Sequence, residues 1–294
     1  MNFLSGFISI LGPTNVGKST LLNRILGTKL AIVTPKPQTT RQRIIGIHNG
    51  DKYQMIFIDT PGIHKIKTPL HKSMVQSAIA SIYEVDTLLL LIDIKHPDNP
   101  AILSIMKNIM EINKPCILGI NKIDLVPKEN LLPIIDKFSN QFNFASIIPI
   151  SALTGDGVDS LIDELKNQLK TGPQFYPDDM FTDQNENALV SEIIREKVYF
   201  STTQELPYST AVTVDNIHKD KKKNILFIEA SIHVETNSQK QILIGYKGQK
   251  IKEIGQSARL DLEKMFDTRI FLNLTVRVAK NWSRDSKALR RLGY

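Results

Sequence analysis

The stretch GPTNVGKS, residues 12–19, directly follows the apolar run 7–11 and directly precedes a segment of helical character. It fits the pattern of a phosphate-binding loop, in the strand–loop–helix setting that the pattern requires. Glycines let the backbone N–H groups of such a loop turn inward around a polyphosphate, and the start of the helix adds its positive dipole end. Lys18 would supply a positive charge to the β and γ phosphates, and Ser19 would supply a hydroxyl to Mg²⁺. The stretch therefore predicts a nucleotide-binding α/β domain.

Outward from this loop, residues 6–170 alternate short apolar runs with longer segments of helical period. One helix is expected over residues 158–169, where apolar residues recur at intervals of three and four. Such alternation implies a mostly parallel sheet that is covered on both faces, so we expect a three-layer α/β/α domain. The expected strands are residues 7–11, 55–58, 88–92, 117–120 and 147–150.

Polar motifs follow three of these strands in a fixed order. Asp59-Thr60-Pro61-Gly62 ends one strand, so its carboxylate would point to the phosphate end of the sheet and could hold a water on Mg²⁺. Asn121-Lys122-Ile123-Asp124 ends another strand, and Ser151-Ala152 follows the next. The Asp124 carboxylate can accept hydrogen bonds from both N1–H and the amino group of guanine, whereas adenine offers neither donor in that geometry. The motifs predict a guanine-nucleotide site that takes GTP and GDP.

The sequence pattern changes near Thr171. Thr171-Gly172-Pro173 is expected to end the last helix of the first domain, and the acidic, proline-containing stretch that follows is typical of a linker. Beyond it the pattern predicts a helix, a β-hairpin, a second helix, a strand and a short last helix. These are placed at residues 188–199, 212–234 with a turn at 219–224, 251–265, 270–278, and up to Gly293. We expect a first domain over residues 1–172, a linker over 173–186 and a smaller α+β domain over 187–294.

Charge is unevenly distributed along the 294 residues, whose formal net charge is +7. Residues 238–294 hold 13 Lys and Arg against 5 Asp and Glu, whereas residues 173–237 hold 6 against 11. This asymmetry favours contact with a nucleic acid or an anionic surface, and a solvated basic helix face is the alternative. The single Cys116 excludes an internal disulfide and favours a reducing compartment. No apolar run approaches the length of a membrane span, and no basic residue precedes the first apolar stretch as in a signal peptide.

After the hairpin, a GxxG sequence, Gly245-Tyr246-Lys247-Gly248, joins two helical segments, so the order is helix, hairpin, helix, GxxG, helix and strand. The order of elements and the lysines around it resemble a KH domain of the type II order. In that fold a GxxG loop clamps four nucleotides of single-stranded nucleic acid, because glycine lets the backbone approach the phosphates. A turn between packed helices is the alternative. The expected RNA contacts are Gly245, Tyr246, Lys247, Gly248, Lys250 and Lys252.

The whole chain resembles the bacterial Era GTPases, and residues 6–170 resemble GTPase domains of the translation-factor class. The resemblance is carried by residues 37–41 (PQTTR), 191–197 (SEIIREK), 205–208 (ELPY) and 288–294 (ALRRLGY), in addition to the motifs above. It implies that the RNA is the 3′ end of 16S ribosomal RNA in the small ribosomal subunit and that the role is ribosome assembly. It also implies that Thr40 closes on Mg²⁺ and the γ-phosphate, and that Lys122 packs over the guanine ring while Asn121 ties the base loop to the phosphate loop.

The motifs and the resemblance together define the expected nucleotide site. The expected Mg²⁺ ligands are Ser19, Thr40 and Asp59. The expected nucleotide contacts are Gly12, Asn15, Val16, Gly17, Lys18, Ser19, Thr20, Asp59, Gly62, Asn121, Lys122, Asp124, Ser151 and Ala152.

Hydrolysis is expected to proceed by in-line attack of water on the γ-phosphate, with Lys18, Thr40 and Asn15 as the catalytic residues. Many related enzymes place a glutamine directly after the Asp-x-x-Gly motif to orient that water, but this chain has Ile63 there. We therefore expect slow unassisted turnover. Asn15 occupies the position of a K⁺ ligand in related GTPases of this branch, and a role in shaping the loop is the alternative.

Other functions compete with this interpretation. A tRNA-modification GTPase of the same branch would carry additional domains. In a binding protein the nucleotide would be only a structural ligand, but the set Lys18, Ser19, Thr40 and Asp59 argues against that. A peripheral contact with the inner face of the cell membrane would rest on the basic C-terminal quarter alone and would be sensitive to salt. We expect a cytoplasmic monomer.

Overall fold

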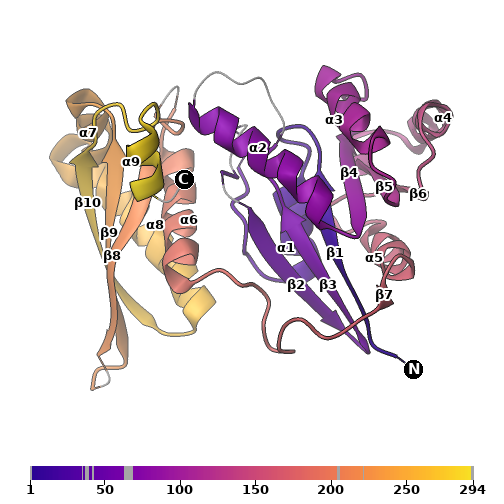
Figure 1. The fold of residues 1–294 in the computed structure, drawn as a ribbon. Helices are drawn as coiled ribbons and strands as arrows, with labels where there is room; N and C mark the ends of the chain where they lie inside the picture. The colour runs from indigo at the N-terminus through magenta and orange to yellow at the C-terminus, as the bar shows by residue number, and fades with distance from the viewer. Residues whose placement is uncertain are drawn as a thin grey trace. The chain divides into compact units, whose positions relative to one another are not determined.

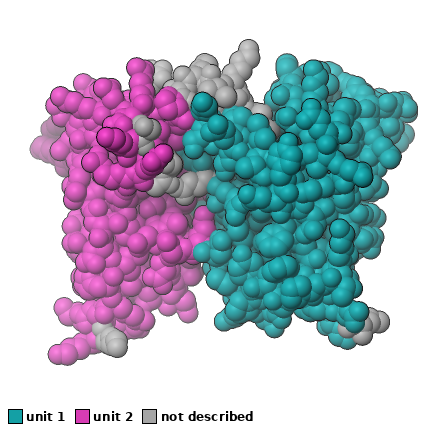
Figure 2. All heavy atoms as spheres, in the orientation of Figure 1, with its two compact units in different colours: residues 1–31, 37–67, 71–183 teal, residues 32–36, 68–70, 184–294 magenta. Residues whose placement is uncertain are grey.

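The structure is a computed structural model, and Figure 1 shows it as a ribbon. It divides into two compact units, which Figure 2 colours teal and magenta. Unit 1 comprises residues 1–31, 37–67 and 71–183, and unit 2 comprises residues 32–36, 68–70 and 184–294. The residues that the structure describes are 2–34, 36, 40–41, 43–62, 69–203, 206–220 and 222–292.

Unit 1 is built on a sheet whose strands lie in the order β2-β3-β1-β4-β5-β6. From β3 to β6 the neighbouring strands run parallel, whereas β2 is antiparallel to β3 and the short β7 is antiparallel to the start of β1. The strands are β1 (Leu4–Leu11), β2 (Ile44–Gly50), β3 (Tyr53–Asp59), β4 (Thr87–Asp93), β5 (Cys116–Asn121), β6 (Ser146–Pro149) and β7 (Lys170–Thr171).

Helices cover both faces of this sheet (Figure 1), which confirms the predicted three-layer architecture. Side chains of α2, α3 and α4 share one buried cluster with β1, β4 and β5, in which Leu88, Leu90 and Ile92 are fully buried. A strand buried on both faces is apolar along its whole length, which is why β4 has the sequence TLLLLID. The helices are α1 (Lys18–Leu26), α2 (Pro69–Glu84), α3 (Pro100–Met110), α4 (Leu131–Gln141) and α5 (Val158–Asn167), with short 3₁₀ turns η1 (Ile123–Leu125) and η2 (Lys128–Asn130).

Two strands of unit 1 were not expected from the sequence. β2 carries glycine, histidine and asparagine among its isoleucines, so its pattern is set by pairing with β3 and not by a buried apolar run. The prediction that the last helix continues through Leu169 was wrong, because α5 ends at Asn167. Lys170 and Thr171 then pair with Ser5 and Leu4 of β1.

The stretch expected to be a linker is anchored on unit 1 as far as Thr182. The Gln54 side chain accepts hydrogen bonds from the backbone N–H groups of Phe175 and Tyr176, at 2.9 and 3.0 Å. The Thr182 hydroxyl donates to the Ile45 carbonyl at 2.7 Å. Tyr176 and Met180 pack against a small apolar cluster of β2 and β3. These few irregularly spaced anchors have no period that the sequence would reveal.

Unit 2 has a sheet of the order β10-β9-β8, in which β8 and β9 form an antiparallel hairpin and β10 runs parallel to β9. The predicted hairpin, helices and last strand are all present in it. Its core lies between one face of this sheet and the helices, and Ile194, Ile228, Leu243 and Ile254 are fully buried there. The elements are α6 (Glu186–Ser201), β8 (Ala211–Asp220), β9 (Ile225–Val234), α7 (Asn237–Ile244), η3 (Tyr246–Gly248), α8 (Gln249–Phe266), β10 (Arg269–Val278) and α9 (Ser286–Arg291).

Trp282 anchors the C-terminal part of unit 2. Its side chain is fully buried, and its indole Nε1–H donates to the Ser209 carbonyl at 2.9 Å. The tryptophan lies ahead of α9, and its burial leaves no exposed ring face on which a base could stack. Gly293, the expected end of the last helix, lies outside the described residues.

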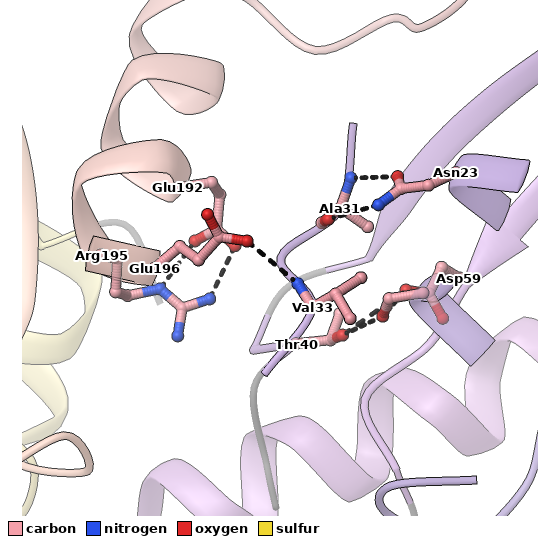
Figure 3. A network of polar contacts seen from close by, with 9 residues as sticks. Asn23, Ala31, Val33, Thr40, Asp59, Glu192, Arg195 and Glu196 are labelled. Atoms are coloured by element: carbon pink, nitrogen blue, oxygen red, sulfur yellow. Dashed lines mark hydrogen bonds and ion pairs between the residues drawn. The ribbon is translucent and has the colours of Figure 1, made fainter. Parts of the chain in front are cut away.

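Unit 2 also includes residues 32–36, which lie between α1 and β2 in the sequence. The backbone N–H of Val33 donates to Glu196 Oε1 of α6 at 3.4 Å, as Figure 3 shows. The Lys36 ammonium donates to the backbone carbonyls of Tyr199 and Thr202 at the end of the same helix. A short piece of chain from within the unit 1 sequence thus completes the surface of α6.

Across the described part of the chain, no helix combines the length and the apolar character that crossing a bilayer demands.

Candidate nucleotide and RNA sites

The phosphate-binding loop begins where β1 ends at Leu11, and two of its glycines are required by the backbone. Gly12 and Gly17 have φ values of 151° and 102°, which side chains rarely adopt. A Cβ on Gly17 would overlap the side-chain amide of Asn121, and one on Gly12 would lie 2.5 Å from the Leu91 carbonyl oxygen. The loop therefore leads directly into α1 with its backbone close to the neighbouring strands.

Lys18 is held inside this loop. Its ammonium donates to the carbonyl oxygens of Gly12 and Pro13 at 3.1 and 2.9 Å, and the residue is only 6% exposed. Burial lowers the pKa of Lys18 to about 8, and the charge of Asp59 offsets only part of this effect. A buried ammonium bound by two neutral carbonyls is poorly compensated, so a polyphosphate at this loop would be a strong counter-charge.

Three oxygen-bearing side chains meet beside the loop. Ser19 Oγ donates to Asp59 Oδ2 at 2.7 Å and lies 3.0 Å from Thr40 Oγ1. Thr40 Oγ1 lies 3.4 Å from the same carboxylate, and Figure 3 shows these two residues. The other carboxylate oxygen, Oδ1, is buried and has no hydrogen-bond partner among the described residues. Burial raises the pKa of Asp59 to about 6 against the opposing effects of Lys18, Ser19 and Thr40.

This arrangement fits a magnesium ion. Two hydroxyls and a carboxylate are hard oxygen donors of the kind that Mg²⁺ prefers, and an orphaned buried carboxylate oxygen gains most from a cation. The structure thus brings together the three residues predicted as metal ligands. Their role as ligands stays a prediction.

The base side of the site is organised by Asn121. Its Nδ2 donates to the Val16 carbonyl at 2.7 Å, and its Oδ1 accepts from the Ala152 N–H at 2.9 Å. The amide therefore ties the phosphate-binding loop to the loop after β6, as expected from the family resemblance. Ser151 Oγ donates to Asp124 Oδ1 at 2.6 Å, which fixes the carboxylate predicted to bind guanine.

Lys122 is fixed by a residue that the sequence analysis missed. Its ammonium donates to the Asn15 carbonyl at 2.8 Å and to Asp93 Oδ2 at 2.6 Å. Burial acts to raise the pKa of Asp93, but the hydrogen bonds and charges of Lys122, Lys95 and His96 outweigh it and leave the pKa lowered. Asp93 ends β4 just as Asp59 ends β3, so its position at a strand end was a signal that could have identified it.

The remaining predicted nucleotide contacts lie in the same region of unit 1. Thr20 follows Ser19 in α1. Gly62 approaches the loop so closely that a Cβ there would lie 2.9 Å from the Thr14 Cα. Ile63 and the motif residues Pro37, Gln38 and Thr39 lie outside the described residues, as does Glu205 of the second domain.

The GxxG loop of unit 2 connects α7 to α8. Gly245 has a φ of 72° and a ψ of 177°, and a Cβ there would lie 2.7 Å from Lys250 Cβ. Gly248 has a φ of 78° with open space around it, and α8 begins at the next residue. Tyr246 is 79% exposed between them. The loop therefore presents its backbone and the start of a long helix on the surface.

A groove of about 640 Å³ lies next to this loop, between α8 and the edge strand β10. It contains an arginine, a lysine and a glutamine among apolar side chains. This mixture suits a single-stranded nucleic acid, which has flat bases and charged phosphates. Apart from Lys252, none of the lining residues was predicted, because a helix face next to a strand edge has no motif. The lining residues are Ile251, Lys252, Gly255, Gln256, Arg259, Leu272 and Leu274.

Both units match known domain families. Residues 7–122 match the domain family described as 50S ribosome-binding GTPase, and residues 205–283 match the KH domain family. The GTPase Era of Syntrophus aciditrophicus is 53% identical over 292 residues, which cover 99% of this chain and 95% of that protein. The chain belongs to the Era GTPase family. The Era protein of Geobacter metallireducens is 47% identical, with 99% and 98% of the two chains covered.

Solved Era structures have the same fold. Aquifex aeolicus Era bound to GDP and AlF₄⁻ has a TM-score of 0.96 and 41% identity, and the match covers 100% of this chain and 99% of that one. Era in complex with MgGDPNP and nucleotides 1506–1542 of 16S ribosomal RNA matches equally well, with a TM-score of 0.96 and 99% of both chains covered. This Era-family chain is a GTPase, with GTP and GDP as nucleotides and Mg²⁺ as cofactor, and its second unit is a KH domain.

Proposed function

We propose that this GTPase binds the single-stranded 3′ segment of 16S ribosomal RNA on its KH unit and acts in the assembly of the small ribosomal subunit in the cytoplasm. The observation that carries the proposal is the exposed GxxG backbone placed beside the α8–β10 groove. The solved relative with nucleotides 1506–1542 of 16S ribosomal RNA supports the choice of RNA. We further propose the domain limits 1–172, 173–186 and 187–294 for the GTPase domain, linker and KH domain.

For hydrolysis we propose that Lys18 holds the β and γ phosphates while Ser19, Thr40 and Asp59 hold the magnesium ion. The ion would supply positive charge to the phosphate oxygens. The chain's own residues position the substrate: the loop N–H groups bind phosphate, and Asp124 with Ser151 and Lys122 fixes the base. Since Ile63 has no group that can orient the attacking water, we propose slow basal turnover with Asn15 as a ligand for a K⁺ ion.

The RNA proposal can be tested at Gly248, where open space and a positive φ make asparagine and aspartate the best-tolerated side chains. Gly248→Asp adds a negative charge at the clamp, and Gly248→Asn adds the same shape without charge. We expect about a tenfold loss of affinity for a single-stranded RNA of the 3′ segment with Asp and a loss below about threefold with Asn. Fluorescence anisotropy of a labelled RNA on the full chain would measure both.

The control is GTP affinity, which both variants should retain because Lys18 and Asp124 are in unit 1. A duplex of the same length should compete poorly, because the clamp needs unstacked nucleotides. Equal RNA affinity of the parent protein and Gly248→Asp would overturn the placement of RNA on this loop.

A further inference from the structure

The KH sheet has a second face that the RNA proposal does not use. Residues of β8, β9 and β10 alternate between the helix-packed core and this outer face. On the outer face Phe271, Phe227 and His218 are direct neighbours in register, one from each strand. They form a continuous row of three aromatic rings, which we call the aromatic row.

The rings of the aromatic row lie close together. Those of His218 and Phe227 are stacked, with centroids 5.0 Å apart and planes 9° from parallel, and the Phe227 and Phe271 centroids are 5.3 Å apart. Phe271 is 56% exposed and His218 is also exposed. Exposed aromatic side chains on a sheet cost solvation free energy unless a ligand covers them, so the row is a candidate contact surface.

The charges around the row include the exposed carboxylate of Glu229, two residues from Phe227 on the same face, but basic residues outnumber acidic ones and favour an anionic partner. Arg269 lies two residues before Phe271 on the same face of β10, and Lys222 and Lys223 are in the hairpin turn that ends β8. The Asp220 carboxylate near them accepts hydrogen bonds from the backbone N–H groups of both lysines, at 2.9 and 3.2 Å. These two hydrogen bonds hold the carboxylate against the turn. Figure 1 shows that the turn end of the hairpin extends past the helices of unit 2.

The aromatic row and the α8–β10 groove, which we propose binds RNA, lie on opposite faces of the same strand, β10. β10 is the edge strand of the sheet, and Leu272 and Leu274 on its inner side line the groove. Phe271 is the neighbour of Leu272 in the chain and points to the opposite face. A single-stranded RNA that leaves the groove therefore needs only to cross β10, which is about 5 Å wide, to reach the aromatic row.

We propose that the aromatic row is a second contact for single-stranded RNA, on which bases that flank the clamped nucleotides stack. This inference rests on the proposed RNA-binding function of the GxxG loop. Stacking suits this surface because every base has a flat π face, whereas a protein partner would need a wider apolar patch without flanking cations. The row thereby extends the RNA site from one face of the sheet to both.

The test compares Phe271→Leu, which keeps an apolar side chain but removes the ring, with Phe271→Tyr, which keeps the ring. Two unstructured RNAs are used with the full chain, one of about five nucleotides that fills the clamp and one of about twelve that reaches beyond it. We expect Phe271→Leu to weaken binding of the long RNA about tenfold and to leave the short RNA unchanged. Phe271→Tyr should bind both like the parent protein.

Gly248→Asp distinguishes this proposal from the proposed RNA clamp on which it rests, because it should weaken the binding of both RNAs. If Gly248→Asp weakens the binding of both RNAs while Phe271→Leu binds the long RNA with the affinity of the parent protein, the aromatic row is not an RNA contact. If Gly248→Asp has no effect on either RNA, the clamp proposal itself fails. Photo-crosslinking of a long RNA with 4-thiouridine at its flanking positions should label the peptide that contains Phe271, and absence of that peptide would also overturn the proposal.

Discussion

Asp93 Oδ2 lies 2.6 Å from the Lys122 ammonium, across the ends of the neighbouring parallel strands β4 and β5. The same ammonium reaches the Asn15 carbonyl of the phosphate-binding loop at 2.8 Å. The ion pair therefore fixes the lysine that is expected to pack over the guanine ring, and it connects the base side of the site to the phosphate side.

Removing the charge of Asp93 should weaken nucleotide binding without changing base preference. We expect Asp93→Asn to lower the affinity for GDP about three- to tenfold, since the lysine keeps one of its two anchors. Fluorescence titration with a labelled GDP would measure it. His96→Ala is the matched control, because His96 lies 3.6 Å from the same carboxylate but is largely exposed. An equal effect of both substitutions would contradict a specific role of the Asp93–Lys122 pair.

Base selectivity should depend on Asp124. Asp124→Asn turns one acceptor oxygen into a donor, which conflicts with the guanine amino group and suits the additional carbonyl of xanthine. We expect the preference to move from GTP to XTP by at least tenfold in competition binding. Asp156→Asn, in the following loop, should leave the preference unchanged. Unaltered GTP affinity of Asp124→Asn would show that another group recognises the base.

The raised pKa of Asp59 has a consequence for stability in the absence of nucleotide and metal. A carboxyl whose folded pKa is raised to about 6 stabilises the fold below its unfolded pKa near 4, and this stabilisation is lost as the pH rises through about 6. Asp59→Asn is neutral at every pH. It should therefore unfold at higher urea than the parent protein at pH 7.5, by on the order of 2 kcal/mol, and the difference should fall below about 1 kcal/mol at pH 4.5.

The measurement is urea unfolding of nucleotide-free protein in EDTA at the two pH values. Asp51→Asn, on an exposed turn, is the control and should show no such dependence. A difference between the Asp59 variant and the parent protein that is the same at both pH values would mean that the buried carboxyl does not titrate in this range.

Potassium dependence can be tested at Asn15 without disturbing the loop backbone. Asn15 has a φ of 62°, so alanine would add strain there, whereas glycine adopts this conformation freely. We expect GTP hydrolysis by the parent protein to be faster in K⁺ than in Na⁺, and Asn15→Gly to remove the difference while GDP affinity stays within about threefold. Equal rates of the parent protein in the two salts would leave Asn15 with a loop-shaping role only.

The strands and motifs that the sequence predicts are those with strong local signals. The fully apolar β4 and the phosphate-binding loop are recognisable from a few consecutive residues, because burial on both faces and a positive φ at glycine each restrict the residue type. The meeting of the phosphate-binding loop with Asp59 follows from the same logic, since the carboxyl ends of parallel strands meet at one edge. Thr40 precedes the antiparallel β2, and only the family resemblance placed it at this site.

The features that could not be predicted depend on partners far along the chain. The hydrogen bond from Thr182 to Ile45 joins residues 137 positions apart, and the contact of Val33 with Glu196 joins residues 163 positions apart. The lining of the α8–β10 groove and the aromatic row arises from register between strands, which single-sequence patterns do not specify. Such contacts become visible only when the fold is known.

The inclusion of residues 32–36 in unit 2 bears on how the molecule is made. Val33 and its partner Glu196 are 163 positions apart, so on the ribosome the first leaves the exit tunnel roughly ten to thirty seconds before the second. During that interval residues 32–36 have no helix to dock on. The docking site of residues 32–36 is therefore completed only after α6 has been translated, and a chain stopped before α6 would carry these residues without the helix that holds them.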